Sequence, residues 1–360
     1  MKIYKIFALP SHTFVDKVSG TDYVRVIQPL KYLDGYKDKE VEFQVKVYDH
    51  SQNKSFDWRD IFRDYDAIYF NYTSNDVGYA IMGLLAQKYN RKLICDIDDD
   101  IFNILPNNPA HEVFKKGAWG NVVVRAVLED VAHVTCTNSH LKHSLEFNAQ
   151  KMKGITVIPN YIDLSLYKYR CKFKDRGYYK ALHFGSSTHH GDLYSPAFVE
   201  GLDRIMKEYP NFTFTTIGSH IPRFKNKWGI RYEIAFGHQD LFEWIKMMPE
   251  IMDDTDFMLV PLDNNTYTRS KSSIKRWEVS SYKIPFIGQK IRQYNEVVTH
   301  GVDGLLCSTA DEWYSAIKLM LDNPSKRKEF GEAGYKRTVK EAQIQNHLEE
   351  YSDMLKKVLT

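Results

Sequence analysis

One stretch decides the fold: FMLVPL at residues 257–262, a polar turn at 263–268, and RSKSSIKRWE at residues 269–278. The apolar run predicts a buried strand, and the last segment predicts a helix. A helix that begins after such a turn presents free backbone N–H groups and the positive end of its dipole. The cations and hydroxyls gathered at this helix start therefore indicate an anion site that suits phosphate.

At helical spacing, Lys271, Lys275 and Glu278 share one face of the predicted helix. We expect the lysines to contact a diphosphate and Glu278 to accept hydrogen bonds from sugar hydroxyls. Arg269, Ser270 and Ser272 complete the predicted ligand set of this segment. The alternative is a solvated helix face with charge pairs between neighbouring turns.

Short apolar runs alternate with helix-length segments along the chain. This alternation predicts parallel α/β units, and a break at residues 160–180 indicates a connection between two similar doubly wound halves. Ligands bind beyond the carboxyl ends of such strands, so the loops there are the candidate sites. We expect strands at residues 3–9, 41–48, 67–71, 92–97, 133–137 and 156–159 in the first half, and at 181–185, 213–218, 231–236, 257–262, 284–287 and 304–307 in the second.

The composition of the 360 residues is that of an ordinary globular protein, with 43% hydrophobic and 26% charged residues. No apolar run is long enough for a membrane helix and no secretory signal is evident, so we expect a cytoplasmic protein. The four cysteines lack C-x-x-C spacing, so neither a zinc knuckle nor a disulfide framework is predicted. The net charge of +3 is compatible with a polyanionic acceptor but is too small to indicate nucleic acid by itself.

The loop after the first predicted strand contains Gly20 and Thr21, and Arg25 follows in the next helix. Glycine and a hydroxyl permit close approach of the backbone to a ligand, and Arg25 adds positive charge. An ordinary turn with a helix cap is the competing interpretation. The chain lacks G-x-G-x-x-G, so a dinucleotide site is not predicted.

Four carboxylates stand within five residues at the end of another predicted strand: Asp96, Asp98, Asp99 and Asp100. Like charges this close repel one another, which points to a ligand or to full solvation. We favour recognition of sugar hydroxyls. Two alternatives stay open, namely binding of magnesium or manganese by adjacent carboxylates and capping of the next helix by Asp100.

The first strand of the second half ends in Gly185, Ser186 and Ser187, with His189 two residues later. Small residues leave N–H groups free for phosphate, and His189 can donate to a phosphate oxygen or act as an acid. A metal site here would need a third His or Cys at ligand spacing, which the loop does not provide.

Taken together, these segments resemble the retaining glycosyltransferases of the family-4 type, whose GT-B fold consists of two facing Rossmann-like domains around a cleft. The resemblance spans nearly the whole chain. Four segments carry it. GSSTHHGD at 185–192 is similar to the G-S-x-T-H-x-x-D loop of the family, and PL at 261–262 with KSSIKRWE at 271–278 is similar to its P-L…K-S-x-x-K-x-x-E segment. The other two are VIPNYID at 157–163 and GVDGLL at 301–306. The Asp-rich loop is similar to that of a subset of the group.

The resemblance implies an acceptor-side domain at residues 1–165, a donor-side domain at 166–335, and a C-terminal helix at 336–360 that packs back toward the first domain. It also implies transfer of a hexose or pentose from a nucleoside diphosphate sugar, with a UDP-sugar favoured, retention of configuration and no required metal or other cofactor. Lys271 and Arg269 would neutralise the leaving diphosphate and His189 would be a second anchor. Asp98 or Asp99 would orient hydroxyls, or act as the base if the reaction inverted configuration.

One departure from the family pattern concerns Ser270. The common form has a second glutamate eight positions before the one that matches Glu278, and here that position is Ser270. The position faces the donor sugar in the family, so the identity of the transferred sugar stays open.

The acceptor is open between a cell-envelope glycan or lipid-linked sugar, with peripheral membrane contact, and a hydroxymethylated pyrimidine of DNA. A non-catalytic sugar-nucleotide-binding protein and a sugar-nucleotide epimerase are further alternatives. The presence of Lys271, Lys275 and Glu278 together favours transfer over both.

Overall fold

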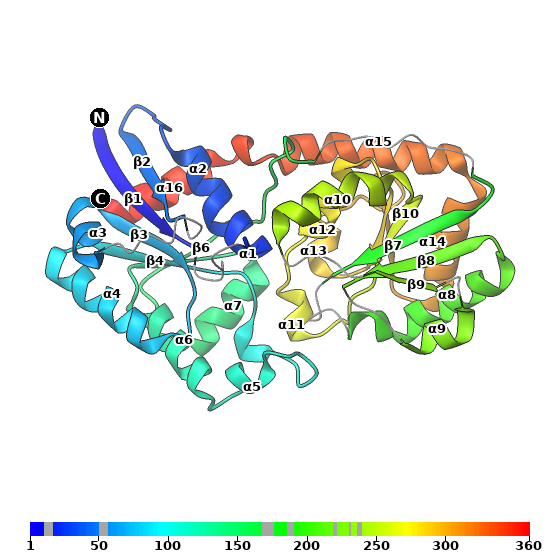
Figure 1. Cartoon of the computed structure of the whole chain (residues 1–360), viewed down its shortest axis with the longest axis horizontal. Coiled ribbons are helices and arrows are strands. Elements are labelled where there is room, and N and C mark those ends of the chain that lie inside the picture. The colour runs from blue at the N-terminus through cyan, green and yellow to red at the C-terminus, as the bar shows by residue number, and fades with distance from the viewer. Residues whose placement is uncertain are drawn as a thin grey trace.

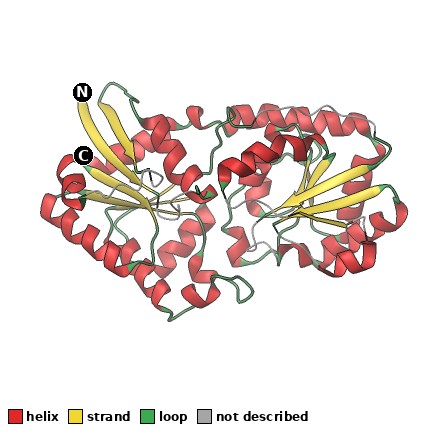
Figure 2. Cartoon of the chain, viewed as in Figure 1, coloured by secondary structure: helices red, strands yellow, loops and turns green. Residues whose placement is uncertain are grey.

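The computed structural model describes residues 1–10, 17–49, 57–167, 176–185, 191–218, 222–229, 232–235 and 240–360. They form two lobes, each with a parallel six-stranded sheet between helices (Figures 1 and 2). Each sheet is buried on both faces, because separate apolar clusters lie on its two sides. The predicted fold class, α/β with two facing Rossmann-like domains, is confirmed.

The first lobe has the strand order β2-β1-β3-β4-β5-β6. Its strands are β1 (Lys2–Leu9), β2 (Val41–Val47), β3 (Ala67–Asn71), β4 (Lys92–Ile97), β5 (His133–Cys136) and β6 (Ile155–Val157). Its helices are α1 (Gly20–Asp22), α2 (Gln28–Leu33), α3 (Trp58–Asp64), α4 (Asp76–Tyr89), α5 (His111–Phe114), α6 (Trp119–Asp130) and α7 (Ser139–Asn148), with a π-helical stretch (Tyr23–Ile27) between α1 and α2.

The second lobe has the strand order β12-β11-β10-β7-β8-β9. Its strands are β7 (Tyr179–Phe184), β8 (Phe212–Ile217), β9 (Tyr232–Ala235), β10 (Phe257–Val260), β11 (Phe286–Gln289) and β12 (Leu305–Cys307). Its helices are α8 (Pro196–Glu208), α9 (Pro222–Trp228), α10 (Leu241–Asp253), α11 (Thr266–Arg269), α12 (Ile274–Ser281), α13 (Arg292–Val297), α14 (Ala310–Asp322) and α15 (Pro324–Glu341), and the chain ends in α16 (Leu348–Leu359).

The C-terminal end differs from the single closing helix that the sequence predicts. The helix α15 ends at residue 341, and the chain then pairs with the connection between the lobes. Ile162 donates its N–H to the carbonyl of Ala342 (2.8 Å), and Ile344 donates its N–H to the carbonyl of Ile162 (3.0 Å). These bonds replace helical ones, so the helix is interrupted before α16. Figure 1 shows α15 along the second lobe and α16 along the first.

The helix α16 belongs to the core of the first lobe. Its side chains Tyr351, Met354 and Leu355 are buried in one cluster with residues of β1, β2 and α2. Both ends of the chain therefore contribute to this lobe. The domain boundaries that the sequence predicts, at residues 165 and 335, stay predictions.

Candidate functional site

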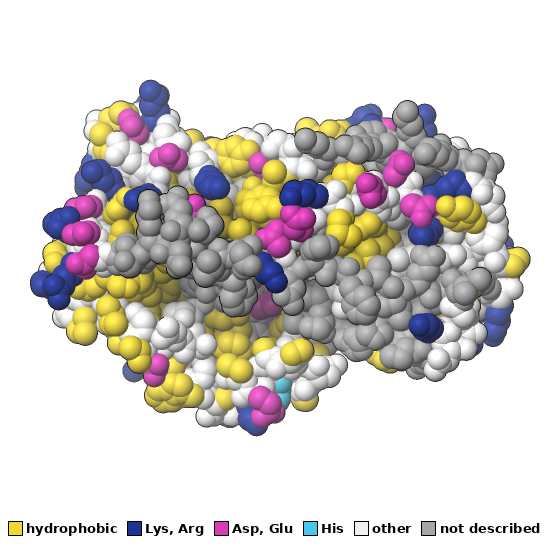
Figure 3. Space-filling model, viewed as in Figure 1, with side chains coloured by type: hydrophobic (Ala, Val, Ile, Leu, Met, Phe, Trp, Pro, Cys, Tyr) yellow, Lys and Arg dark blue, Asp and Glu magenta, His cyan; other side chains and the backbone are white. Residues whose placement is uncertain are grey.

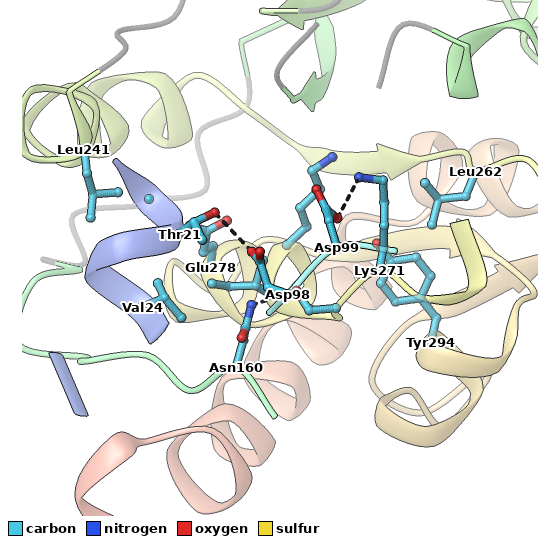
Figure 4. Close-up of a pocket in the computed structure, with 14 residues that line it drawn as sticks. Thr21, Val24, Asp98, Asp99, Asn160, Leu241, Leu262, Lys271, Glu278 and Tyr294 are labelled. Carbon is cyan, nitrogen blue, oxygen red and sulfur yellow. Dashed lines mark hydrogen bonds and ion pairs between the residues drawn. The ribbon is translucent and has the colours of Figure 1, made fainter. Parts of the chain in front are cut away.

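A cavity of about 250 Å³ lies between the two lobes (Figure 4). Its lining includes segments that follow β1 and β4 in the first lobe and β10 and β11 in the second, beside the points where the strand order of each sheet reverses. Doubly wound sheets bind ligands outside the carboxyl ends of the strands at such points. The residues that line it come from both lobes: Gly20, Thr21, Val24, Asp98, Asp99, Asn160, Leu241, Leu262, Lys271, Ser272, Ile274, Lys275, Glu278 and Tyr294.

The segment after β10 does not form one helix from residue 269 to 278, which corrects the prediction from the sequence. A capping box closes the turn: the side chain of Asn265 accepts from the N–H of Thr268, and the Thr268 hydroxyl accepts from the N–H of Asn265. The resulting helix α11 ends at Arg269, and α12 begins only at Ile274. Lys271 and Ser272 thus lie between two helices, although both still line the cavity.

Lys271 is buried and points across the cavity toward the first lobe (Figure 4). Its Nζ lies 3.6 Å from Oδ1 of Asp99 and 3.4 Å from the hydroxyl of Tyr267, above whose ring it is placed. Burial alone lowers the pKa of Lys271, but the charges of Asp99 and Asp192 and the contact with Tyr267 outweigh burial and raise it. These neighbours therefore favour the charged form of Lys271 at the junction of the lobes.

Lys275 is a buried lysine with no hydrogen-bond partner for its Nζ among the described residues. Burial has the largest effect on the pKa of Lys275 and lowers it. The charge of Asp192 raises this pKa in part, and the charge of Lys271 lowers it further. Burial also raises the pKa of the Asp192 carboxyl, although both lysines oppose this change. An uncompensated ammonium facing a cavity favours an anion there.

Glu278 lines the same cavity one turn of helix after Lys275. Burial raises the pKa of Glu278 to about 7, although Lys275 and a hydrogen bond from the Tyr167 hydroxyl (3.4 Å) partly offset the increase. The carboxylate has oxygen lone pairs left for donors such as sugar hydroxyls.

In the first lobe, Gly20 and Thr21 lie at α1 and Asp98 follows β4. The Thr21 hydroxyl donates to Oδ2 of Asp98 (3.1 Å), which fixes this carboxylate at the cavity wall (Figure 4). Asp98 and Asp99 face the lysines of the second lobe from the opposite side. The structure thus brings together Gly20, Thr21, Asp98, Asp99, Lys271, Ser272, Lys275 and Glu278.

Arg25 and Asp96 do not line the cavity. Both are fully buried and form an ion pair, with Nη2 of Arg25 2.7 Å from Oδ2 of Asp96. Nη1 of Arg25 also donates to the Asn160 side chain (2.9 Å), whose amide donates to the Ser272 hydroxyl (2.9 Å). The two residues therefore support the cavity wall from behind, because they hold Asn160 against the second lobe.

Asp100 and Ser270 are also turned away from the cavity. The Ser270 hydroxyl donates to Oδ2 of Asp100 (3.2 Å), and both side chains are buried. Arg269 is exposed and donates to the Asn264 side chain (2.7 Å). Asp100 makes no capping hydrogen bond to the short helix that follows it.

Gly185 directly follows the strand β7 and donates its N–H to the carbonyl of Ile217 (3.0 Å). The remaining residues of the predicted phosphate loop, Ser186, Ser187 and His189, lie outside the described residues. Within the described ranges, no group of three or more His, Cys, Asp or Glu side chains is arranged as a metal site.

Sequence reasoning missed several residues of the site. Asn160 lines the cavity, and its place in the segment that joins the lobes was the available signal. Tyr294, at the start of α13, also lines it and is buried. Asp192 belongs to the motif at 185–192 but not to the predicted site, and the effect of both lysine charges on the pKa of its carboxyl follows only from the three-dimensional arrangement.

Comparisons with known proteins agree with this geometry. A family model described as Glycosyl transferase-like matches residues 197–353, and no curated protein matches the sequence. HepE from Anabaena, solved in complex with UDP, has a TM-score of 0.61 at 15% identity, covering 99% of this chain and 100% of that one. Sucrose-phosphate synthase from Thermosynechococcus elongatus has a TM-score of 0.64 at 14% identity, covering 98% and 99%. A glycosyltransferase from Rickettsia africae has a TM-score of 0.61 at 14% identity, covering 99% of each chain.

The fold and the family match together define the class: the chain is a glycosyltransferase with the GT-B fold. The enzyme class predicted from the sequence is thereby confirmed. The family-4 type, retention of configuration and the acceptor stay predictions.

Proposed function

We propose that the chain transfers a sugar from a nucleoside diphosphate sugar, with a UDP-sugar favoured, to an acceptor hydroxyl with retention of configuration. The observation that carries this proposal is the buried Nζ of Lys275, which lacks a hydrogen-bond partner among the described residues and lines the cavity between the lobes. A diphosphate supplies the negative charge and acceptor oxygens that this ammonium lacks. Structures similar in fold have been solved with UDP and with UDP-glucose, which supports the same donor class here.

In this proposal, each cavity residue has a role that its position supports. Lys271 and Lys275 bind the diphosphate, and Glu278 accepts hydrogen bonds from the ribose hydroxyls. Asp98 and Asp99 orient hydroxyls of the donor sugar or of the acceptor from the opposite wall. Ser272 adds a hydroxyl beside Lys271.

The chemical step breaks the bond between the anomeric carbon and the diphosphate oxygen, and forms a bond from the same carbon to the acceptor oxygen. Positive charge develops on the sugar ring and negative charge on the diphosphate, so the two lysines stabilise the leaving group. Attack on the face that the leaving group vacates retains configuration. The departing phosphate oxygen takes the acceptor proton, and no protein base is then needed.

The leaving-group role is tested by replacing Lys271 with alanine. We expect the Lys271→Ala variant to keep its fold but to lose turnover by about 100-fold or more, because it loses a charge that acts on the developing diphosphate. Lys246→Ala is the matched control, since Lys246 is an exposed lysine of the same lobe. Turnover is measured with a panel of nucleoside diphosphate sugars. Retained turnover in Lys271→Ala contradicts the assignment, and lack of transfer or donor hydrolysis by the wild type with every donor favours a non-catalytic binding protein.

A divalent metal is not part of the proposal, because two lysines supply positive charge at the diphosphate. We expect EDTA to leave turnover unchanged. Loss of turnover in EDTA that manganese restores contradicts this part of the proposal and leaves the lysine roles to be tested separately.

A further inference from the structure

Lys271 is held in place by a second residue of its own lobe, Tyr267. Its Nζ lies 4.6 Å from the centre of the Tyr267 ring and donates to the phenolic oxygen at 3.4 Å. The face of the ring and the oxygen both attract a cation. A lysine side chain is long and flexible, so these two contacts order the ammonium before any ligand arrives.

Tyr267 lies behind Lys271 rather than in the cavity wall. Of the described residues, those that line the cavity include Lys271 and Asp99 but not Tyr267, whose side chain is buried. On the cavity side, Lys271 points toward Asp99, which lies 3.6 Å from Nζ and has a side chain that is 38% exposed (Figure 4). An anion that enters the cavity therefore meets the ammonium from the side of Asp99 and leaves its contact with Tyr267 intact.

The hydroxyl of Tyr267 acts by its position and not by its charge. Burial and the charge of Asp99 raise the pKa of this hydroxyl to about 12, although Lys271 and Asn108 offset part of the increase. The hydroxyl is therefore protonated and neutral at physiological pH. It contributes an acceptor oxygen to Lys271 and no negative charge that would compete with a phosphate.

Tyr267 is in turn fixed by the first lobe, through Asn108. The side-chain amide of Asn108 donates to the phenolic oxygen (3.1 Å). Oδ1 of Asn108 already accepts from the N–H of Ala110 (2.9 Å), so the nitrogen end of the amide faces Tyr267. Asn108 is buried as well. The phenolic oxygen thus joins an amide of the first lobe to the ammonium of the second.

These contacts lie where the two lobes meet. Asn108 follows the short helix Ile101–Asn103 of the first lobe, and Tyr267 belongs to α11 of the second. Figure 3 shows Lys or Arg side chains beside Asp or Glu side chains over the junction of the lobes. When the lobes separate, Tyr267 loses Asn108 and Lys271 loses Asp99, because both partners belong to the first lobe. The position of the ammonium therefore depends on closure of the lobes.

We infer that Tyr267 is a positioning residue for Lys271, and that closure of the lobes sets the ammonium in place through Asn108 and Tyr267. This rests on the proposed role of Lys271 at the diphosphate and makes that role dependent on closure. A charge that is already in place stabilises a diphosphate without first being ordered. Without the phenolic oxygen, the diphosphate has to order the lysine itself, and binding weakens.

The test is calorimetric titration of UDP, a probe that requires neither the sugar nor the acceptor to be known. We expect Tyr267→Phe to weaken UDP binding about fivefold, because Lys271 loses an acceptor and is ordered only by the ligand. Asn108→Ala should weaken UDP binding too, and should have no further effect when combined with Tyr267→Phe. Tyr282→Phe is the matched control, since Tyr282 is a buried tyrosine of the same lobe whose hydroxyl has no hydrogen-bond partner among the described residues.

A double-mutant cycle separates an effect through Lys271 from a structural role. We expect Lys271→Ala alone to weaken UDP binding about tenfold, since it removes a charge at the diphosphate. In the Lys271→Ala background, Tyr267→Phe should change UDP binding by less than about twofold, because the side chain that it positions is gone. A merely structural role for Tyr267 predicts the same loss with and without Lys271. Urea unfolding shows whether each variant is folded, and if Tyr267→Phe is not, Asn108→Ala takes its place in the cycle.

UDP binding by Tyr267→Phe that equals that of the wild type overturns the inference. Tighter binding does so as well, because the contact then holds the lysine away from the ligand, and so does an equal loss with and without Lys271. If Lys271→Ala weakens binding and Tyr267→Phe does not, only the role of Tyr267 fails. A wild type that binds no UDP, GDP or ADP contradicts the proposed function itself.

Discussion

Lys275 shows how a residue that a ligand needs destabilises the empty protein. Its ammonium is buried in the cavity wall, and among the described residues no group accepts a hydrogen bond from it. Burial therefore lowers its pKa, although Asp192 favours the charged form. A lysine whose pKa is lower in the folded chain than in the unfolded chain binds fewer protons when folded.

The stability of the chain should increase when Lys275 is replaced by methionine. The penalty of the lysine is full at a pH below its lowered pKa and fades as pH rises toward its ordinary value near ~10.4. We expect Lys275→Met to raise the free energy of unfolding by about 1–2 kcal/mol at low pH, with the difference shrinking at alkaline pH. Urea unfolding across this range is the measurement. A variant less stable than the wild type at every pH means that Lys275 has an internal partner.

Ser270 shows how a contact between elements sets a side chain's direction. Because α11 ends before it, the Ser270 hydroxyl turns toward the short helix after β4 and bonds to Asp100. The pKa of Asp100 is raised by burial. Ser270, which stands where the resembled family has a second glutamate, thus makes a contact between the lobes.

Restoring that glutamate should not restore a sugar-binding carboxylate. In Ser270→Glu, a larger acidic group is forced against buried Asp100, so we expect a loss of about 2–4 kcal/mol in the free energy of unfolding. Ser270→Ala should cost about 1 kcal/mol, the loss of a hydrogen bond. Pairing Ser270→Glu with Asp100→Asn should recover part of the loss. A stable Ser270→Glu variant with tighter donor binding indicates that residue 270 faces the cavity.

The strands were predictable from the sequence to within about two residues, because strand runs such as 67–71 and 92–97 are apolar and end at polar turns. The pairing of Arg25 with Asp96 could not be predicted, because 71 residues separate the two in the sequence and each resembled a charge that binds a ligand. The capping box at Asn265 also overrode the helical spacing from residue 269. Lys271, Lys275 and Glu278 still converge, because the carboxyl ends of the strands place this segment at the cavity.

At the scale of the whole molecule, the two lobes touch on both sides of the cavity. On one side, Asp240 accepts from the N–H of Val18 (2.8 Å), within an apolar cluster of α10 and the helix that follows α1. On the other side of the cavity, the side-chain amide of Asn138 donates to the carbonyl of Ser270 (2.7 Å). The side-chain amide of Asn108 donates to the hydroxyl of Tyr267 (3.1 Å). The described structure is a closed arrangement in which both lobes contribute to one site.

The most direct test of the central claim, that this cavity binds a nucleoside diphosphate, is calorimetric titration of UDP at about pH 8 in buffers of different ionisation enthalpy. Glu278, with a pKa raised to about 7, is then mostly ionised before binding, and the difference in proton uptake between the wild type and Lys275→Met reports the lysine. The account predicts UDP binding with uptake of protons as the diphosphate restores the charged form of Lys275, and neither strong binding nor uptake in Lys275→Met. Equal binding by Lys275→Met, or no binding of UDP, GDP or ADP by the wild type, contradicts it.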